Sequence, residues 1–357
     1  MNRDTLLAIL DLARWAPSGD NTQPWRFEIV ADDRVAVHGH DTRAEVLYDF
    51  DGHASQMAHG ALLETLRIAA SGFALECVWQ ARPGCPEHAP VYDVELREAP
   101  GLPPDPLAAC IRQRTVQRRP MRTTALTATQ RDALRRAPGD AYRVDFFESP
   151  GARLAVAGLL WRNAHLRLTC PEAYQVHRAV IEWNARFSQD RIPDQAVGVD
   201  PLTARLMHWV MQRWERVDFF NRYLFGTIAP RIQLDFLPAL ACAGHLLMCP
   251  RRPLATPGDH VEAGVALQRL WLTATACGLH LQPQMTPVIF RWYVQAGRSI
   301  SRTPHIDPGA SALAARFETL AGAGRDDPFA FFCRVGSCAP PRSRSIRKEL
   351  AELLTRQ

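Results

Sequence analysis

The sequence predicts an α+β fold in which one unit of helices and short strands occurs twice. Helical and strand periodicities alternate along the chain, and two segments reappear later in the same order. Apolar residues make up 47% of the 357 residues and charged residues 22%, as in an ordinary globular protein. We therefore expect two similar lobes, which together form a pseudo-dimer.

The first lobe is expected within residues 1–100. Its first helix ends at Pro17, because the residue before a proline avoids the helical conformation. Alternating apolar residues on both sides of Asp32 and Asp33 predict two strands joined by a turn. The expected elements are a helix over 4–16, strands over 25–30 and 34–38, a helix over 56–71, and strands over 77–81 and 91–97.

The second lobe is expected within residues 101–357, after a proline-rich connector over 100–106. Asp259 and Glu262 stand at the spacing of a capping box, which predicts a helix that begins there and ends near Gly278. The other expected elements are strands over 142–147 and 328–335.

Two pairs of segments indicate an internal duplication. Residues 11–20 and 132–140 agree in Asp, Arg, Ala, Pro, Gly and Asp when Ser18 is skipped. Residues 60–75 and 264–279 agree without a gap in Gly, Leu, Leu, Ala and Leu. Helices rich in Ala and Leu also resemble one another by chance. The two matches in the same order favour a duplication, and two copies are too few for a solenoid.

The second copy is longer than the first between its two matched segments, which places an insertion at about 157–236. Leu206, Val210, Trp214 and Val217 recur at helical spacing there and predict one apolar helix face. One interpretation is a helical hairpin that extends the core. The other is a lid over a ligand site.

Charge and motifs exclude several classes of function. The net charge of +5 is too small to indicate a nucleic-acid binder, and Lys348 is the only lysine, which excludes a pyridoxal Schiff base or a phosphate-loop lysine in the body of the fold. No His-Glu-x-x-His or Gly-x-Ser-x-Gly motif occurs. The pattern that begins at Gly322 has Asp327 where a dinucleotide-binding loop needs its third glycine.

Cysteine usage and hydropathy predict a cytoplasmic protein. The nine cysteines are an odd number without zinc-finger spacing, which fits a reducing compartment better than a disulfide framework. The N-terminal residues lack the apolar block of a signal peptide. The longest apolar run, residues 236–249, is too short to cross a bilayer. We expect no metal site and no membrane partner.

A polar turn follows the first helix and presents Ser18, Asn21 and Gln23. Amide side chains both donate and accept hydrogen bonds, so they suit the edge of a planar heterocycle. The alternative is a turn that only leads into a hairpin, because Ser, Gly, Asp and Asn are common turn residues.

The second copy lacks this turn but has an arginine-rich block over residues 112–122, which includes Arg114, Gln117 and Arg118. Five arginines at an expected helix end would make a good phosphate anchor. The alternatives are a solvated basic helix end or a nucleic-acid module, and the lack of interleaved aromatic residues disfavours the module. Each copy thus keeps one half of what looks like a binding site.

Four blocks of the sequence resemble the nitroreductase family of flavin proteins. Residues 16–27 resemble its Asn-Thr-Gln-Pro-Trp signature, and residues 114–120 resemble its N-terminal Arg-x-Ser-x-Arg block. Residues 264–279 resemble its long core helix, and residues 334–344 resemble its C-terminal phosphate-contacting segment. The order of the blocks is similar to that of the internally duplicated, Acg-like branch.

The resemblance implies two α+β lobes with FMN between them, in place of a homodimer of separate subunits. It also implies a role for each matched residue. Arg114 and Arg118 would hold the phosphate and pyrimidine side of FMN, Ser18, Asn21 and Gln23 would meet the isoalloxazine, Arg342 and Arg344 would replace the usual basic pair, and Gln284 and Met285 would lie near flavin N5. Val116 stands where the family has serine. Only one pairing of lobes keeps both half-sites, so we expect one FMN per chain.

The resemblance further implies an FMN-dependent oxidoreductase. Hydride would pass through flavin N5 between a reduced nicotinamide, NADH or NADPH, and a small planar substrate. The alternative is an FMN-binding or storage protein whose lid prevents turnover. In either case the expected partner is a small molecule, with no nucleic acid, and the pseudo-dimeric chain is either a monomer or one half of a homodimer.

Overall fold

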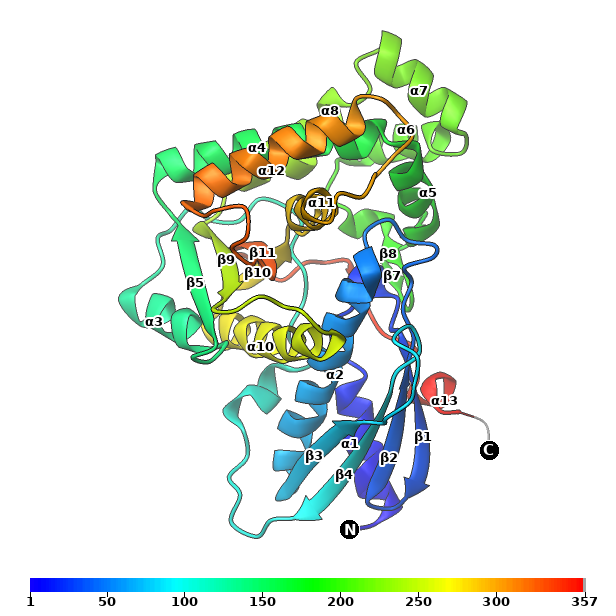
Figure 1. Cartoon of the computed structure of the whole chain (residues 1–357), viewed down its shortest axis with the longest axis vertical. Coiled ribbons are helices and arrows are strands. Elements are labelled where there is room, and N and C mark those ends of the chain that lie inside the picture. Colours follow the sequence, from blue (N-terminus) through cyan, green and yellow to red (C-terminus); the bar gives the residue numbers. More distant parts are fainter. Residues whose placement is uncertain (356–357) are drawn as a thin grey trace.

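The computed structural model describes residues 1–355 and contains two four-stranded antiparallel sheets (Figure 1). The first sheet has the strand order β1-β2-β4-β3. Its strands are β1 (Trp25–Ala31), β2 (Arg34–Gly39), β3 (Leu75–Ala81) and β4 (Val91–Glu98). All four predicted strands of the first unit are confirmed to within two residues at either end.

The second sheet has the order β10-β11-β9-β5, and all of its strand pairs are also antiparallel. Its strands are β5 (Tyr142–Phe147), β9 (Gly244–Pro250), β10 (His280–Pro283) and β11 (Phe331–Gly336). Counted in chain order within each unit, both sheets place their strands as first, second, fourth and third. The α+β class is thus confirmed, and the common topology supports the duplication, which stays a prediction.

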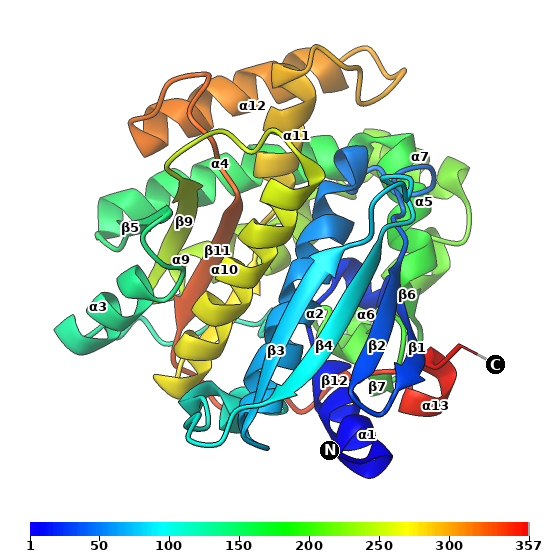
Figure 2. The same cartoon turned by 60° about the horizontal axis from the view of Figure 1, so that its bottom comes forward.

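Two long helices, α2 (His53–Ser71) and α10 (Pro257–Ala276), pack against each other between the sheets (Figure 2). A methyl group on Gly60 would collide with the carbonyl oxygen of Val261, and one on Gly264 would collide with that of Met57. The repeated segments align Gly60 with Gly264, so the same close contact is made twice. Gln268 adds a buried hydrogen bond from its Nε2 to Oγ1 of Thr65, at 2.8 Å.

Each unit has its own hydrophobic core, and each core takes residues from the other unit's long helix. The first core holds Trp25 and Phe27 of β1 together with Val261 and Leu272 of α10. The second core holds Met57 of α2 among residues of the second unit. The two units are therefore one packed body rather than separate domains on a linker.

The other helices surround this centre. They are α1 (Arg3–Ala13), α3 (Ala128–Arg136), α4 (Pro150–Thr169), α5 (Pro171–Val180), α6 (Pro201–Val210), α7 (Trp214–Tyr223), α8 (Ile228–Pro230), α9 (Leu237–Leu240), α11 (Thr286–Gln295), α12 (Ile306–Ala321) and α13 (Leu350–Leu353). The short strands β6 (Ile181–Glu182) and β8 (Ile192–Pro193) pair with each other, as do β7 (Phe187–Ser188) and β12 (Arg344–Ser345).

Three local predictions are corrected by the structure. The capping box of α10 is formed by Thr256 and Asp259, not by Asp259 and Glu262, because Pro257 occupies the first helical position. The apolar face predicted from Leu206 to Val217 is broken, because α6 ends at Val210 and α7 begins at Trp214. The block 112–122 is not at the end of an α-helix. It follows a short 3₁₀ helix, Pro106–Cys110, and Val116 then forms an isolated bridge with Leu281.

The C-terminal segment returns from the second unit to the first. After β12, α13 places Leu353 in the first core, and Leu354 forms a bridge with Phe27 of β1 (Figure 1). The end of the chain therefore helps to complete the unit in which the chain begins.

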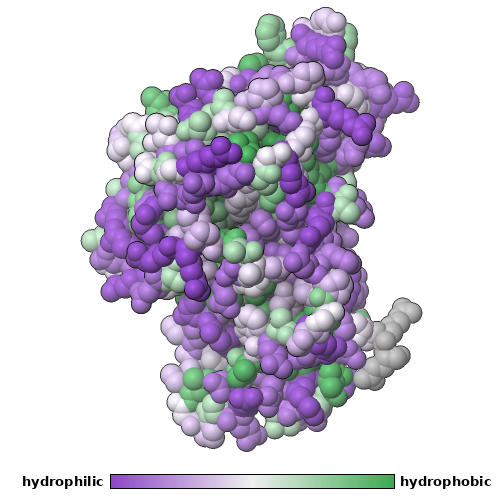
Figure 3. Space-filling model, in the orientation of Figure 1, coloured by the Kyte–Doolittle hydropathy of each residue, from purple (hydrophilic) through white to green (hydrophobic). Residues whose placement is uncertain are grey.

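The surface seen in Figure 3 is mostly hydrophilic, with scattered apolar areas. In residues 1–355 no helix has the length and apolar character that a membrane span requires. All nine cysteines are free thiols.

Gly60→Ala should destabilise the protein by at least about 3 kcal/mol, because the new methyl group meets backbone that cannot move aside. Chemical denaturation measures this change. Gly158→Ala in α4 is the matched control, because its methyl group would meet no atom within 4 Å, and it should stabilise the protein by roughly 0.5–1 kcal/mol. Equal effects of the two substitutions would contradict a tight helix crossing.

Candidate functional site

A cavity of about 460 Å³ lies between the two units and is lined by residues of both. The predicted site residues that line it are Ser18, Asn21, Arg114, Arg118, Gln284, Met285 and Arg344. Gln23, Gln117 and Arg342 are not among the lining residues. The structure thus brings together parts of the polar turn, the arginine block and the C-terminal segment.

The polar turn has an unusual backbone. Asp20, Asn21 and Gln23 have φ angles of 48°, 67° and 51°, in the left-handed region that non-glycine residues rarely adopt. Oγ of Ser18 accepts a hydrogen bond from the Gln23 N–H at 2.9 Å, which closes the turn. Such strain persists only where the surroundings hold it in place.

The amide side chains of Asn21 and Gln23 make many of the hydrogen bonds that keep the turn in this conformation. Nδ2 of Asn21 donates to the carbonyl of Gln189 at 3.0 Å, and its Oδ1 accepts from Arg347 at 2.8 Å. Nε2 of Gln23 donates to the same Gln189 carbonyl at 2.8 Å, and its Oε1 accepts from the Lys348 N–H at 3.0 Å. Both amides therefore tie the turn to the insertion and to the C-terminal segment.

The turn is also held from the side of α2. Nε2 of the fully buried His59 lies 2.7 Å from the carbonyl oxygen of Pro24. Burial lowers the pKa of His59 to about 4, so its imidazole is neutral at pH 7 and donates to this carbonyl.

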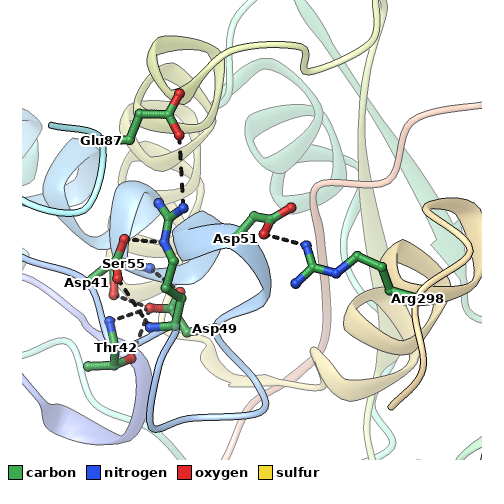
Figure 4. A network of polar contacts seen from close by, with 8 residues as sticks. Asp41, Thr42, Asp49, Asp51, Ser55, Glu87 and Arg298 are labelled. Carbon is green, nitrogen blue, oxygen red and sulfur yellow. Dashed lines mark hydrogen bonds and ion pairs between the residues drawn. The ribbon is translucent and has the colours of Figure 1, made fainter.

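The loop between β2 and α2 carries Tyr48 into the cavity wall. Asp49 is buried and organises this loop by accepting hydrogen bonds from the backbone and side chain of Thr42, at 2.8 and 2.9 Å, and from those of Ser55, at 3.0 and 2.6 Å (Figure 4). Arg298 of the second unit pairs with Asp51 at 2.5 Å (Figure 4). The loop is therefore fixed to both units.

Three arginines form a positively charged cluster in the cavity wall: Arg114, Arg344 and Arg347. Arg114 donates from Nη2 to the carbonyl of Trp15 at 2.8 Å and stacks over Trp271 at 4.6 Å. Its Nε is buried without a hydrogen-bond partner. In the described part of the chain no carboxylate pairs with Arg114, Arg344 or Arg347.

The pKa values of Arg114 and Arg347 are shifted in the direction expected for buried positive charges without a counter-charge. Burial lowers the pKa of Arg114, and the charges of Arg347 and Arg344 lower it further. Burial and the neighbouring Arg344 and Arg14 lower the pKa of Arg347 to about 9. Buried like charges are costly until an anion neutralises them, so the cluster is suited to a phosphate.

A second polar group in the wall combines both signs of charge. Arg167 pairs with Asp235 at 3.0 Å, and burial raises the pKa of Asp20 against the opposing effect of Arg118 and Arg167. The hydroxyl of Tyr48 lies 2.9 Å from Nε2 of His177. Burial and then the charge of Arg167 lower the pKa of His177 to about 3, which keeps its imidazole neutral.

The N-terminus of α11 opens into the cavity. Met285, Thr286 and Pro287 line it, and no side chain caps this helix. The free N-terminal end of a helix is partly positive, which favours negative charge nearby. The preceding Gln284 is held in place, because its Oε1 lies 2.8 Å from Nδ1 of His245 and its N–H donates to the carbonyl of Phe332 at 2.8 Å.

The insertion supplies an apolar wall of the cavity. Ile181, Ile192, Met207, Met211 and Leu234 all line it. None of the side chains of α6 or α7 is fully buried, and Leu206 and Trp209 are each about half exposed. Helix α6 therefore reaches the cavity through Met207, whereas α7 contributes no lining residue.

The three predicted residues outside the cavity have other contacts. Gln23 is buried behind the turn. Nε2 of Gln117 donates to the carbonyl of Ala339 at 3.3 Å, and its Oε1 accepts from the Arg119 N–H at 3.1 Å. Arg342 is exposed, and with Gln117 it lines a second cleft.

Sequence reasoning missed several cavity residues. Arg347 follows Arg344 in the same basic segment and could have been found there. Trp15 stands directly before the recognised signature. Arg167 and Asp235 lie on helices of the second unit that no local motif marks, whereas Trp271 lies inside the recognised block 264–279.

The stability of the wild-type protein should fall as the pH falls from 6.5 to about 4. Over this range His59 becomes protonated in the unfolded chain but stays neutral in the folded protein. His59→Gln keeps a donor for Pro24 but does not titrate. The slope of its unfolding free energy against pH should be smaller than that of the wild type over this range, by up to roughly 1.4 kcal/mol per pH unit. Denaturant titrations at several pH values measure this difference. The same change at the exposed His88 is the control. An unchanged pH profile in His59→Gln would contradict a buried neutral imidazole.

Part of the sequence of this chain matches a known protein family. A family model described as the nitroreductase family matches residues 1–56. A search of curated proteins finds no match. Similar solved structures include a nitroreductase-like family protein from Bacillus cereus, with 8% identity over 71% of this chain and 96% of that one and a TM-score of 0.35.

Two further similar structures are a BluB-like flavoprotein from Clostridium difficile 630 and the FMN-dependent nitroreductase NfnB from Mycobacterium smegmatis in complex with NADPH. The first has 9% identity over 71% of this chain and 99% of that one, with a TM-score of 0.38. The second has 14% identity over 70% of this chain and 96% of that one, with a TM-score of 0.35. The resemblance to the nitroreductase family is thus confirmed by the family model for residues 1–56, the part of the chain that contains the polar turn.

Proposed function

We propose that the chain is an FMN-dependent oxidoreductase that holds FMN in the cavity between its two units. The observation that carries the proposal is the cluster of Arg114, Arg344 and Arg347 in a cavity wall without a counter-charge, in which Arg114 and Arg347 are buried. The family match over residues 1–56 supports a flavin as the ligand, because it spans the turn that forms another wall of the same cavity.

The residues present fit FMN. The phosphate dianion would satisfy the free Nε of Arg114 and the neighbouring guanidinium groups. Met57, Ala61 and Leu267 offer an apolar surface for a flat ring system. Buried polar atoms without a partner, among them Oε1 of Gln282, could meet the polar edge of the ring. The volume of about 460 Å³ lies in the range of small-molecule sites.

Bound FMN would supply hydride transfer through its N5, from a reduced nicotinamide to a small planar acceptor. The protein's part is to bind, orient and protect. The arginine cluster anchors the charged tail, and Arg118 and the N-terminus of α11 give a positive potential that favours the anionic reduced ring. The apolar residues of the insertion keep water away from the ring.

The second candidate is an FMN-binding or storage protein without turnover. It is favoured by one observation, the contribution of Met207 of α6 and of Met211, which directly follows α6, to the cavity wall, because a helix in that position limits access to the ring. The two candidates share the FMN site and differ only in whether a nicotinamide reaches it.

Arg114→Ala and Arg347→Ala should each weaken FMN binding at least tenfold, because each removes a charged donor from the phosphate end. Asn21→Ala should also weaken it, because the turn loses its tie to Arg347 and Gln189. Flavin absorbance of the purified proteins and FMN titration of the apoproteins measure these effects. Arg316→Ala, at an exposed position on α12, is the control. Normal FMN affinity in Arg114→Ala and Arg347→Ala would refute the composite site.

Anaerobic addition of NADPH or NADH to the FMN-loaded protein should bleach the flavin absorbance. A yellow protein that neither nicotinamide bleaches would support storage instead. In that case a variant lacking residues 200–226, which span α6 and α7, should regain reduction if those helices block access.

A further inference from the structure

We propose that a second cleft, beside the FMN cavity, binds a ligand that carries a diphosphate or polyphosphate group. The cleft has a volume of about 1020 Å³. It contains Gln117 and Arg342, which the sequence singled out and the first cavity does not use. The proposal concerns a separate site and does not depend on which molecule occupies the first cavity.

The cleft is lined by five arginines that come from four segments of the chain. They are Arg118, Arg119, Arg186, Arg205 and Arg342. The only carboxylate in the lining is Asp194, whose Oδ1 accepts a hydrogen bond from the Ala185 N–H at 3.0 Å. The lining therefore has a large excess of positive charge.

Within residues 1–355 no carboxylate lies within ion-pair distance of these five guanidinium groups. Their protein contacts are with carbonyl oxygens: Arg119 with Gln195 at 3.5 Å, Arg186 with Arg342 at 2.9 Å, and Arg118 with Ala196 at 3.4 Å. Each guanidinium has five N–H donors, so most of these donors point to no protein acceptor.

Some other arginines of the protein have a counter-charge. Arg82, Arg97, Arg131, Arg143 and Arg298 each pair with a carboxylate at 3.1 Å or less. Arg153 and Arg251, elsewhere in the protein, also bond only carbonyl oxygens. What distinguishes the cleft is that five arginines without a carboxylate partner, from four segments, line one concave surface. Because the chain has only one lysine, its basic side chains that bind anions are almost all arginines. A guanidinium group can donate two parallel hydrogen bonds to two oxygens of one phosphate.

The number and spread of these arginines favour more than one phosphate group. A single carboxylate would leave most of the guanidinium groups without a counter-charge. Two or more linked phosphates carry several negative charges along a length that can reach different segments. Asn184, Gln195 and Ser343 also line the cleft and offer uncharged donors and acceptors for the rest of such a ligand.

The cleft shares a wall with the first cavity. Val116, Arg118 and Ala196 line both. Helix α6 also takes part in both, because Pro201, Ala204, Arg205 and His208 line the cleft while Met207 lines the cavity. A ligand in the cleft would thus contact the helix that covers the first cavity, and would hold α6 against the arginine block and the C-terminal segment.

Two kinds of ligand carry the phosphate groups that this cleft would bind. The first is the diphosphate bridge of a dinucleotide, whose redox-active end would reach toward the first cavity past the shared wall. The second is a free polyphosphate or nucleotide that fixes α6 and regulates access. Both sources require the same arginines, and the experiment separates them.

The test is calorimetric titration of inorganic pyrophosphate into the full-length, FMN-loaded protein at low salt. The wild type should bind it, with an affinity that falls as salt rises. The double variant Arg119→Ala/Arg342→Ala should bind it at least tenfold more weakly, and Arg316→Ala should bind it like the wild type. No binding by the wild type, equal binding by the double variant, or release of FMN by pyrophosphate would overturn the proposal.

Two readouts identify the source of the phosphate. Displacement of pyrophosphate by NADPH, with a raised KM for NADPH and unchanged FMN content in the double variant, supports the dinucleotide. Displacement by ADP but not by NADPH supports a free nucleotide. Slower amide exchange in residues 201–210 when pyrophosphate binds would show that the ligand contacts α6. A protein that fails to bind FMN but binds pyrophosphate through these arginines would refute the proposed function and keep the second site.

Discussion

The close crossing of α2 and α10 is the contact on which the rest of the structure depends. Gly60 and Gly264 let two helix backbones approach without side chains between them. This approach brings the two sheets together as one body, and it places Met57 of one helix and Leu267 of the other in the wall of the same cavity. A larger residue at either glycine would collide with the facing helix backbone and destabilise the arrangement that forms this wall.

The cavity is a product of chain connectivity as much as of helix packing. The polar turn, the arginine block and the C-terminal arginines belong to segments far apart in the sequence, and hydrogen bonds between them hold the site. Arg347 is central, because it contacts both Ala16 and Asn21 while it faces Arg114 and Arg344 electrostatically. The same residue therefore organises the turn and concentrates positive charge, which is the arrangement that an anionic cofactor would complete.

Residue-level prediction succeeded where the pattern was local. The strands around Asp32 and the strand over 142–147 follow from alternation and turn residues, and the structure has them. It failed where neighbours decide the outcome. The periodicity from Leu206 to Val217 continues across a turn between α6 and α7, and Asn21 and Gln23 bind backbone groups of other segments. Arg167 and Asp235 of the cavity wall had no motif, because their pairing exists only after α4 and the π-helix over Arg231–Phe236 pack together.

The sequence by itself determined the α+β class, six of the eight strands of the two four-stranded sheets (β9 and β10 were missed), the polar turn and the basic segments, because these depend on residue types and spacings within about ten residues. The tertiary structure alone decided which arginines share the cavity and which line the second cleft. Arg344 and Arg347 lie on one side and Arg342 on the other, although only a few residues separate them. The physical reason is that charge compensation depends on distance in space, and the path of the C-terminal segment between the two units sets that distance.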